Sequence, residues 1–243
     1  DFQLIEELIE EINIQEIDHL LEIGPGKGAM TSLLLEKCES LTAIEIDKDL
    51  MRFLKKAYGD RKNFNLIEKD ILLYDPKELV RVNKLIGNIP YNISTPIIEW
   101  IIDNKSSFDE IFLMLQKEFG ERCVAQPNTK SYGRLSIFVQ CFFDVTVIRE
   151  VDKSSFNPSP QVQSIFLKLI PKVSDMTPNS ILMKNLSTLT REAFSKRRKL
   201  ITNSLKSFFT EEDLVNLGIE RKSRPENLSV ETYIKLAKSI QSG

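Results

Sequence analysis

The chain has 243 residues, of which 42% are hydrophobic and 28% charged, a composition typical of a globular protein with one large domain or a large and a small one. No apolar run reaches the ~18–20 residues of a membrane span, and no signal segment opens the chain, so we expect no membrane partner. The net charge is only −2, and the three widely spaced cysteines, Cys38, Cys123 and Cys141, argue against a disulfide framework or a metal site and favour a reducing cytoplasm.

The first half of the chain alternates predicted helices and strands. Apolar residues recur at helical spacing over residues 3–13, which predicts an amphipathic helix. Buried strands are predicted at residues 19–23, 41–46, 64–67 and 84–89. Helices are predicted between them, at residues 29–37, 49–58 and 76–80. This alternation is typical of a parallel sheet in an α/β protein.

A glycine-rich loop, residues 24–28, joins the first predicted strand to the next helix. Gly24, Gly26 and Gly28 allow the backbone to approach a ligand, and the helix that follows offers free N–H groups. The pattern predicts a nucleotide-binding βαβ unit, although its spacing differs by one residue from the dinucleotide motif G-x-G-x-x-G. The alternative is a glycine turn that only joins strand to helix.

Acidic residues follow the next two strands. Glu45 lies 21 positions after Gly24, close to the ~20 expected for a carboxylate that binds ribose hydroxyls. Asp47 is near enough to compete for that role. Asp70 follows the third strand, where it is expected to accept a hydrogen bond from the adenine amine of a cofactor. The alternative is that these are solvated acids at strand ends.

The fourth strand runs into an Asn-Ile-Pro-Tyr segment. One reaction that suits this segment is methylation of the exocyclic amine of an adenine. That amine is a poor nucleophile because its lone pair is delocalised into the ring, so a methylating site must accept hydrogen bonds from its N–H groups. The side-chain oxygen of Asn88 and the carbonyl oxygen of Ile89 are the predicted acceptors; Pro90 favours an extended Ile89 and Tyr91 offers a stacking face. No general base is needed, which suits a chain whose single histidine is His19. The alternative is a strand followed by an ordinary tight turn.

The next predicted elements complete the sheet. They are a helix over 94–103 capped by Ser94 with Trp100 in the core, a strand over 108–115, helices over 117–124 and 135–143, and edge strands over 144–151 and 162–170. A proline-rich loop separates the edge strands. Its Phe156 is a candidate for the other face of a base pocket, and the alternative is a phenylalanine in the core.

After Pro171 the alternation gives way to predicted short helices, at residues 180–195, 197–208, 211–217 and 229–241. We therefore expect a Rossmann-like domain over 1–173 and a helical domain over 174–243. Residues 171–243 hold 13 Lys and Arg against 8 Asp and Glu, a charge of +5, whereas residues 1–170 carry −7. This basic region suggests a polyanionic partner, and its run Lys196–Lys199 is either a phosphate contact or a solvated face.

With these segments assembled, the chain resembles the ribosomal RNA adenine N6,N6-dimethyltransferases along nearly its whole length, and most of all the branch that modifies small-subunit RNA. The resemblance rests on Leu21-Glu-Ile-Gly-Pro-Gly26, Ile44-Glu-Ile-Asp47, Lys69-Asp70, Gly87-Asn-Ile-Pro-Tyr-Asn-Ile-Ser-Thr-Pro96, Leu115-Gln-Lys-Glu118, Ser131-Tyr-Gly-Arg-Leu-Ser136, Phe156-Asn-Pro-Ser-Pro160, Phe194-Ser-Lys-Arg-Arg-Lys199 and Arg224-Pro-Glu-Asn-Leu-Ser229.

The resemblance implies a Rossmann-like S-adenosylmethionine-dependent methyltransferase sheet with a small all-helical C-terminal domain. It implies S-adenosylmethionine as cofactor and S-adenosylhomocysteine as product, no metal, and a monomer that dimethylates two adjacent adenosines near the 3′ end of 16S rRNA during biogenesis of the small ribosomal subunit. The implied cofactor residues are Gly24, Pro25, Gly26, Gly28, Glu45, Ile46, Asp70, Ile71 and Asn88. The implied catalytic residues are Asn88, Ile89, Pro90, Tyr91 and Phe156. The implied RNA-binding residues are Arg134, Lys196, Arg197, Arg198 and Lys199.

Two departures from the family pattern accompany the resemblance. Ile89 stands where the family usually has leucine; it is also familiar in the methylases of large-subunit RNA. The chain begins at Asp1 without the Gln-x-Phe-Leu segment that the family places just before it, so we expect that an N-terminal piece is missing and that cofactor binding suffers. The alternative functions are a non-catalytic ribosome-assembly or transcription factor, a large-subunit RNA methylase and a DNA adenine methylase.

Overall fold

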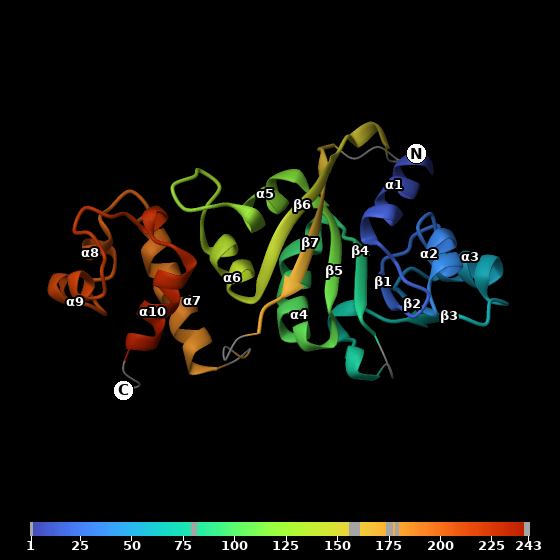
Figure 1. Cartoon of the computed structure of the whole chain (residues 1–243), viewed down its shortest axis with the longest axis horizontal. Coiled ribbons are helices and arrows are strands. Elements are labelled where there is room, and N and C mark those ends of the chain that lie inside the picture. The colour runs from blue at the N-terminus through green and yellow to red at the C-terminus, as the bar shows by residue number, and fades with distance from the viewer. Residues whose placement is uncertain (1, 79–81, 156–160, 174–176, 178–179, 241–243) are drawn as a thin grey trace. The chain divides into compact units, whose positions relative to one another are not determined.

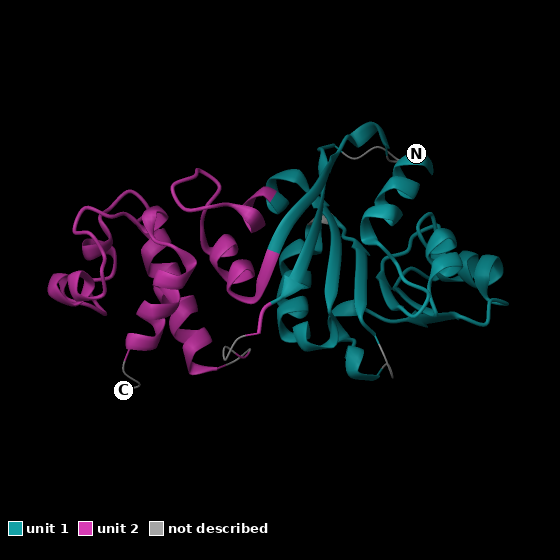
Figure 2. Ribbon diagram, viewed as in Figure 1, with its two compact units in different colours: residues 1–120, 145–171 teal, residues 121–144, 172–243 magenta. Residues whose placement is uncertain are grey.

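The structure is a computed structural model that describes residues 2–78, 82–155, 161–173, 177 and 180–240 (Figure 1). The chain divides into two compact units, residues 1–120 with 145–171 as unit 1 and residues 121–144 with 172–243 as unit 2 (Figure 2). The change of unit at 171/172 lies beside the expected boundary at 173/174. Residues 121–144 differ from the expected division, because the helix they contain packs against two helices of the C-terminal region.

The centre of unit 1 is a seven-stranded sheet. Its strands are β1 (His19–Ile23), β2 (Ser40–Glu45), β3 (Phe64–Glu68), β4 (Lys84–Asn88), β5 (Glu110–Gln116), β6 (Phe143–Val151) and β7 (Ser164–Pro171). The strand order is β3-β2-β1-β4-β5-β7-β6. The first five strands are parallel, and β7 runs antiparallel to β5. This is the Rossmann-like sheet that the sequence predicts.

Helices connect the parallel strands and cover the sheet. They are α1 (Phe2–Ile12), α2 (Thr31–Lys37), α3 (Lys48–Tyr58), α4 (Ser94–Asp103) and α5 (Lys117–Val124), with short 3-10 helices η1 (Ile71–Leu73), η2 (Pro76–Glu78), η3 (Tyr91–Ile93), η4 (Lys105–Ser107) and η5 (Lys153–Ser155). The main hydrophobic core joins α1 and α2 to alternate residues of the sheet, such as Leu20, Ile86 and Phe112. Trp100 of α4 is buried, as predicted, and donates to the carbonyl oxygen of Tyr74.

Unit 2 is helical in the C-terminal region. Its elements are α6 (Arg134–Phe142), α7 (Ile181–Ser195), α8 (Ile201–Ser204), α9 (Glu211–Asn216), η6 (Pro225–Asn227) and α10 (Val230–Ser239). Helices α7 and α10 lie side by side (Figure 1), and α6 packs against both. Within the described residues, no helix is both long and apolar enough to cross a membrane.

Two local predictions are wrong. Ser94 is the first helical residue of α4 and Ile93 holds the cap position without a side-chain bond, since the preceding turn η3 leads directly into the helix. The helix expected over 197–208 is reduced to the four residues of α8, and residues 196–199 form a turn. Its Thr, Asn and Ser are weak helix formers, so the packing of the surrounding chain decides the local conformation.

Candidate active site

The carboxyl ends of the central strands meet where the strand order reverses between β1 and β4. Ile23 pairs with Ile44 on one side and with Gly87 on the other, so the residues that follow these strands emerge at one edge. The Gly24 N–H donates to the Ile44 carbonyl oxygen at 3.1 Å. A Cβ atom on Gly24 would lie 3.5 Å from the Asn88 carbonyl oxygen. The structure thus brings together the predicted glycine loop and the Asn-Ile-Pro-Tyr segment, at the place where α/β sheets bind ligands.

The glycine loop has a backbone that only glycine adopts easily. Gly24 and Gly28 have φ angles of +61° and +77°. A Cβ atom on Gly28 would lie 2.6 Å from a ring carbon of Tyr58, whose hydroxyl donates to the Gly28 carbonyl oxygen. Gly28 therefore has a packing role against α3, whereas a Cβ atom on Gly24 would come near the Asn88 carbonyl oxygen instead. Pro25 is buried and Gly26 is half-buried.

Glu22 is a buried acid directly before the glycine loop, and sequence reasoning did not single it out. Its side chain is buried and accepts a hydrogen bond from the Thr31 hydroxyl at 2.7 Å, which ties β1 to α2 across the glycine loop. Burial raises the pKa of Glu22 to about 7, the Thr31 bond lowers it, and the nearby Glu45 charge raises it. The signal in the sequence was an acid inside an apolar strand, directly before the glycines.

Replacing Glu22 by glutamine is expected to stabilise the protein at neutral pH. A carboxyl group with a raised pKa keeps its proton when folded but loses it when unfolded, so stability falls as the pH rises from 4.5 to about 7. Glutamine removes this cost and still accepts from Thr31, a gain of at most about 3 kcal/mol above pH 7 and none near pH 4. Urea unfolding at both pH values measures it, with exposed Glu36→Gln as control. An equal gain at the two pH values would contradict the assignment.

Glu45 is held rigidly at the end of β2. Its Oε1 accepts from the backbone N–H groups of Ile46 and Asp47, both at 2.9 Å, and the side chain is buried. Asp47 instead caps α3, with its carboxylate accepting from Asp49 and Leu50. The cap therefore favours Glu45 over Asp47 as the ribose-binding acid, which stays a prediction. The side chain of Ile46 is 65% exposed, an apolar surface directly beside Glu45.

Asp70 lies beyond the end of β3, the strand next to β2. Its carboxylate accepts from the Leu72 N–H at 3.0 Å and so caps η1. Ile71 is buried, and its side chain belongs to the core. Asp70 is half-buried, so part of its carboxyl group remains available to a ligand at this edge.

Within the described residues, the end of β4 leaves two oxygen acceptors without a hydrogen-bond partner. The Ile89 N–H donates to the Met114 carbonyl oxygen at 3.1 Å and the Ile89 side chain is buried, which fixes this residue against β5. Asn88 is exposed, and no described residue hydrogen-bonds to its side chain or to the Ile89 carbonyl oxygen. Pro90 is exposed, with φ −58° and ψ 135°. The Tyr91 side chain and the whole of Phe156 lie outside what the structure describes.

The predicted RNA-binding residues all lie in unit 2. Arg134 is the exposed first residue of α6, and Lys196, Arg198 and Lys199 are exposed in the turn after α7. Arg197 differs from these, because its guanidinium is bonded within the protein.

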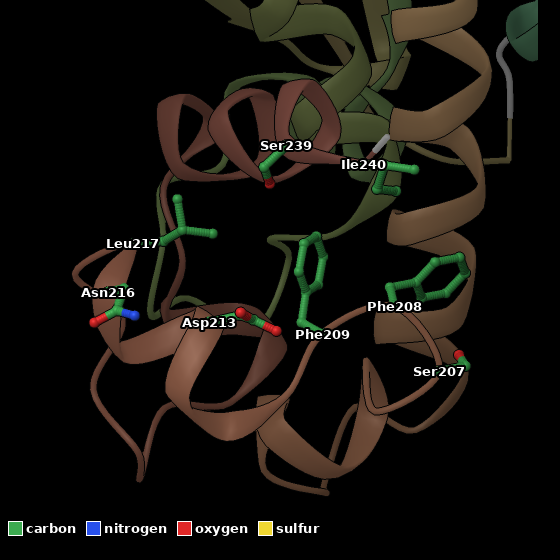
Figure 3. A pocket seen from close by; sticks show the side chains of 8 residues that line it. All are labelled: Ser207, Phe208, Phe209, Asp213, Asn216, Leu217, Ser239 and Ile240. Atoms are coloured by element: carbon green, nitrogen blue, oxygen red, sulfur yellow. The ribbon is translucent and has the colours of Figure 1, made fainter. Parts of the chain in front are cut away.

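Unit 2 also contains a pocket of about 590 Å³, and Figure 3 shows the side chains that line it. The lining residues are Ser207, Phe208, Phe209, Asp213, Asn216, Leu217, Ser239 and Ile240. None of them is a predicted cofactor or target residue, and they belong to the region of α9 and α10. The pocket is therefore separate from the site at the sheet edge.

The parallel sheet, the glycine loop at its switch point and the strand-end acids define a Rossmann-like methyltransferase. Two solved structures share this fold. A dimethyladenosine transferase from Plasmodium falciparum has a TM-score of 0.82 and 31% identity, covering 96% of this chain and 94% of that one. The 23S rRNA methyltransferase ErmE has a TM-score of 0.76 and 22% identity, covering 99% and 98%.

Sequence comparison gives the family. Residues 1–242 match the family model of ribosomal RNA adenine dimethylases. Ribosomal RNA small subunit methyltransferase A of Legionella pneumophila (strain Corby) is 40% identical over 243 residues, covering 100% of this chain and 94% of that protein. The protein of the same name from Coxiella burnetii (strain CbuG_Q212) is 37% identical over 240 residues, covering 98% and 92%. The chain belongs to the ribosomal RNA adenine dimethylase family and is an rRNA adenine dimethyltransferase.

Proposed function

We propose that this enzyme dimethylates two adjacent adenosines near the 3′ end of 16S rRNA in the small ribosomal subunit. The observation that supports the chemistry is that, within the described residues, neither the Asn88 side chain nor the Ile89 carbonyl oxygen has a hydrogen-bond partner, at a strand end whose Asn88 backbone oxygen lies beside Gly24. S-adenosylmethionine, when bound here, supplies an electrophilic methyl group on a sulfonium. Gly24, Glu45 and Asp70 would hold that cofactor, Asn88 and Ile89 would hold the amine nitrogen that takes up the methyl group, and the amine's proton would leave to solvent.

The strand-end residues suit a nucleoside cofactor. Glu45, held by two backbone N–H groups, would accept from ribose hydroxyls, the exposed Ile46 would contact an adenine ring, and the half-buried Asp70 would accept from the adenine amine. The glycine backbone allows close approach of the methionine part. We therefore assign the cofactor to the residues named from the family pattern, with the Ile71 side chain serving the core instead.

On the target side, this chain contributes acceptors and orientation. Asn88 and Ile89 hold the amine N–H groups so that the nitrogen lone pair faces the methyl group, and such orientation is a large part of catalysis in transfer reactions. A monomethylated amine retains one N–H, so a second transfer uses the same acceptors. Extruding the base costs a few kcal/mol, which stacking on Tyr91 and Phe156, at ~1–3 kcal/mol per base, offsets.

The small-subunit target is supported by the names of the 37–40% identical relatives, whereas the 23S rRNA methyltransferase ErmE is only 22% identical. The basic helical region, +5 over residues 171–243, supports a second area of contact with RNA phosphates. The enzyme acts as a monomer in this proposal, because a single chain supplies both areas.

Parallel labelling tests the substrate. Methyl-labelled S-adenosylmethionine is incubated with the enzyme and, separately, with small-subunit particles lacking the modification, 16S rRNA, 23S rRNA and duplex DNA. We expect labelled dimethyladenosine only in the two small-subunit substrates, the particles and 16S rRNA, and none in 23S rRNA or duplex DNA. Preferential labelling of 23S rRNA would instead assign the enzyme to the large-subunit methylases, and labelling of DNA would overturn the RNA assignment.

A further inference from the structure

Three segments meet within unit 2, and none of them contains a predicted cofactor or target residue. They are the loop of residues 126–133, the turn of residues 196–199 and the segment of residues 224–229. The Asn128 N–H donates to the Glu226 carbonyl oxygen at 2.8 Å, and the Asn227 side chain donates to the Asn128 side-chain oxygen at 2.7 Å. Asn128 has a φ angle of +69°, an uncommon conformation for a residue with a side chain, and these bonds hold it.

The loop of residues 126–133 and the segment of residues 224–229 are also joined through three packed aromatic side chains. The Tyr132 hydroxyl donates to the Leu228 carbonyl oxygen, and the Tyr233 hydroxyl donates to the Pro225 carbonyl oxygen, both at 2.9 Å. The Phe194 ring lies between the two tyrosine rings, with centroids 6.3 Å and 6.0 Å away. The loop and the 224–229 segment are thus anchored through well-packed residues, so their exposed parts have a defined position.

Arg197 joins all three segments. Its Nε donates to the Glu226 carboxylate at 2.6 Å, and a terminal guanidinium nitrogen donates to the Thr129 carbonyl oxygen at 3.2 Å. Among the residues that the structure describes, the other basic residues of these segments form no such ion pair. Within the described part of the chain no acid pairs with Lys130, Lys196, Arg198, Lys199 or Arg224, and all five are exposed.

We propose that Arg197 is a positioning residue that clamps the 126–133 loop to Glu226, so that Lys130 and Arg224 join Lys196, Arg198 and Lys199 in one surface for the phosphates of a folded RNA. The proposal rests on the rRNA substrate proposed above and gives Arg197, whose charge is paired with Glu226, a different role from the phosphate contact that the resemblance implies. Exposed, unpaired cations from three segments favour a polyanion, because each phosphate contact releases a counterion.

The clamp is tested without RNA by hydrogen exchange of the Asn128 amide. Arg197→Met and Glu226→Gln are each expected to speed that exchange about tenfold by local opening of the loop. Glu220→Gln, which removes the same charge from an exposed position elsewhere in unit 2, is the matched control and should leave the rate unchanged. Unchanged exchange in both clamp variants would show that Arg197 holds nothing in place.

RNA binding distinguishes clamp from contact. If Arg197 is a clamp, Glu226→Gln weakens binding of small-subunit rRNA as Arg197→Met does. If Arg197 is instead a phosphate contact, Glu226→Gln frees it and tightens binding, as removal of an acid does in Glu220→Gln, and the proposal is wrong.

Lys130 provides an independent test, since an exposed loop lysine is not needed for folding. Lys130→Ala and Arg198→Ala are each expected to lower the slope of log affinity against log salt by about 0.7–0.9. An unchanged slope for Lys130→Ala would remove the loop from the surface. These measurements report binding alone, so they remain decisive for the surface even if the labelling experiment assigns the methyl group to a different nucleotide.

Discussion

Replacement of Asn88 by alanine is expected to lower methyl transfer by about 100- to 1000-fold, the usual effect of losing one hydrogen bond that strengthens in the transition state. Asn88 is an exposed residue at the end of β4, opposite Met114 of β5, and its backbone carbonyl oxygen lies beside Gly24. Its side-chain oxygen is one of two acceptors that draw the adenine amine toward tetrahedral geometry. The Ile89 carbonyl oxygen remains in the variant, so transfer falls steeply while some activity is retained.

Single-turnover methylation and RNA affinity together test this prediction. RNA affinity should stay close to that of the parent, because the basic residues of unit 2 are unaffected. Asn92→Ala is the matched control: Asn92 is an exposed asparagine in the adjoining turn η3, and its loss should leave the rate unchanged. Near-normal methylation by the Asn88 variant would refute the acceptor mechanism.

Replacement of Lys84 by methionine is expected to destabilise the protein by about 3–5 kcal/mol, the cost of leaving buried charges without their partner. Lys84 starts β4, at the opposite end of that strand from Asn88, and its side chain is 8% exposed. Its Nζ lies 2.8 Å from Asp18 and 3.3 Å from Glu110, and donates to the Asn13 carbonyl oxygen at 2.9 Å. Lys168 also pairs with Glu110, so the loss of Lys84 affects Asp18 more than Glu110.

The pKa values of Asp18 and Glu110 determine how the difference in stability between the parent and the Lys84 variant changes with pH. Burial favours a higher pKa for Asp18 and Glu110, but hydrogen bonds and the charges of their partners, Lys84 among them, lower both pKa values overall. Carboxylates with lowered pKa values stabilise the fold above their ordinary values of 3.8 and 4.5, and this contribution is lost as the pH falls further. The gap between parent and Lys84→Met should therefore close on acidification.

Denaturant unfolding at neutral and acidic pH measures that gap. The matched control is Arg52→Met, which breaks an ion pair with Asp49 whose two side chains are 77% and 87% exposed. An exposed pair contributes little, so its loss should cost less than about 1 kcal/mol at any pH. A Lys84 variant that behaves like this control would show that the charge cluster is not a source of stability.

The strands of the sheet were predictable because hydrophobic runs, and the residues that end them, are properties of neighbouring residues in the sequence. Short apolar runs bounded by glycine or acids marked β1 to β4, and the parallel register then brought their carboxyl ends to one edge. That rule brings the glycine loop, Glu45, Asp70 and Asn88 together, while the role of each came from motif spacing and from the chemistry of an adenine amine. The family resemblance added the target chemistry, which no spacing of residues supplies by itself.

Packing between segments added what the local sequence left open. The burial of Glu22 and its bond from Thr31 depend on the folded backbone, whereas the bonds of Glu45 and Asp47 join residues only one to three positions apart. The basic residues after α7 looked alike in the sequence. In the part of the chain that the structure describes, Arg197 alone among Lys196–Lys199 forms an ion pair, with Glu226, which lies 29 positions away. Pairing between distant side chains depends on the folded backbone, whereas helix and strand periods depend on neighbours along the chain, and this is why the elements could be predicted and their partners could not.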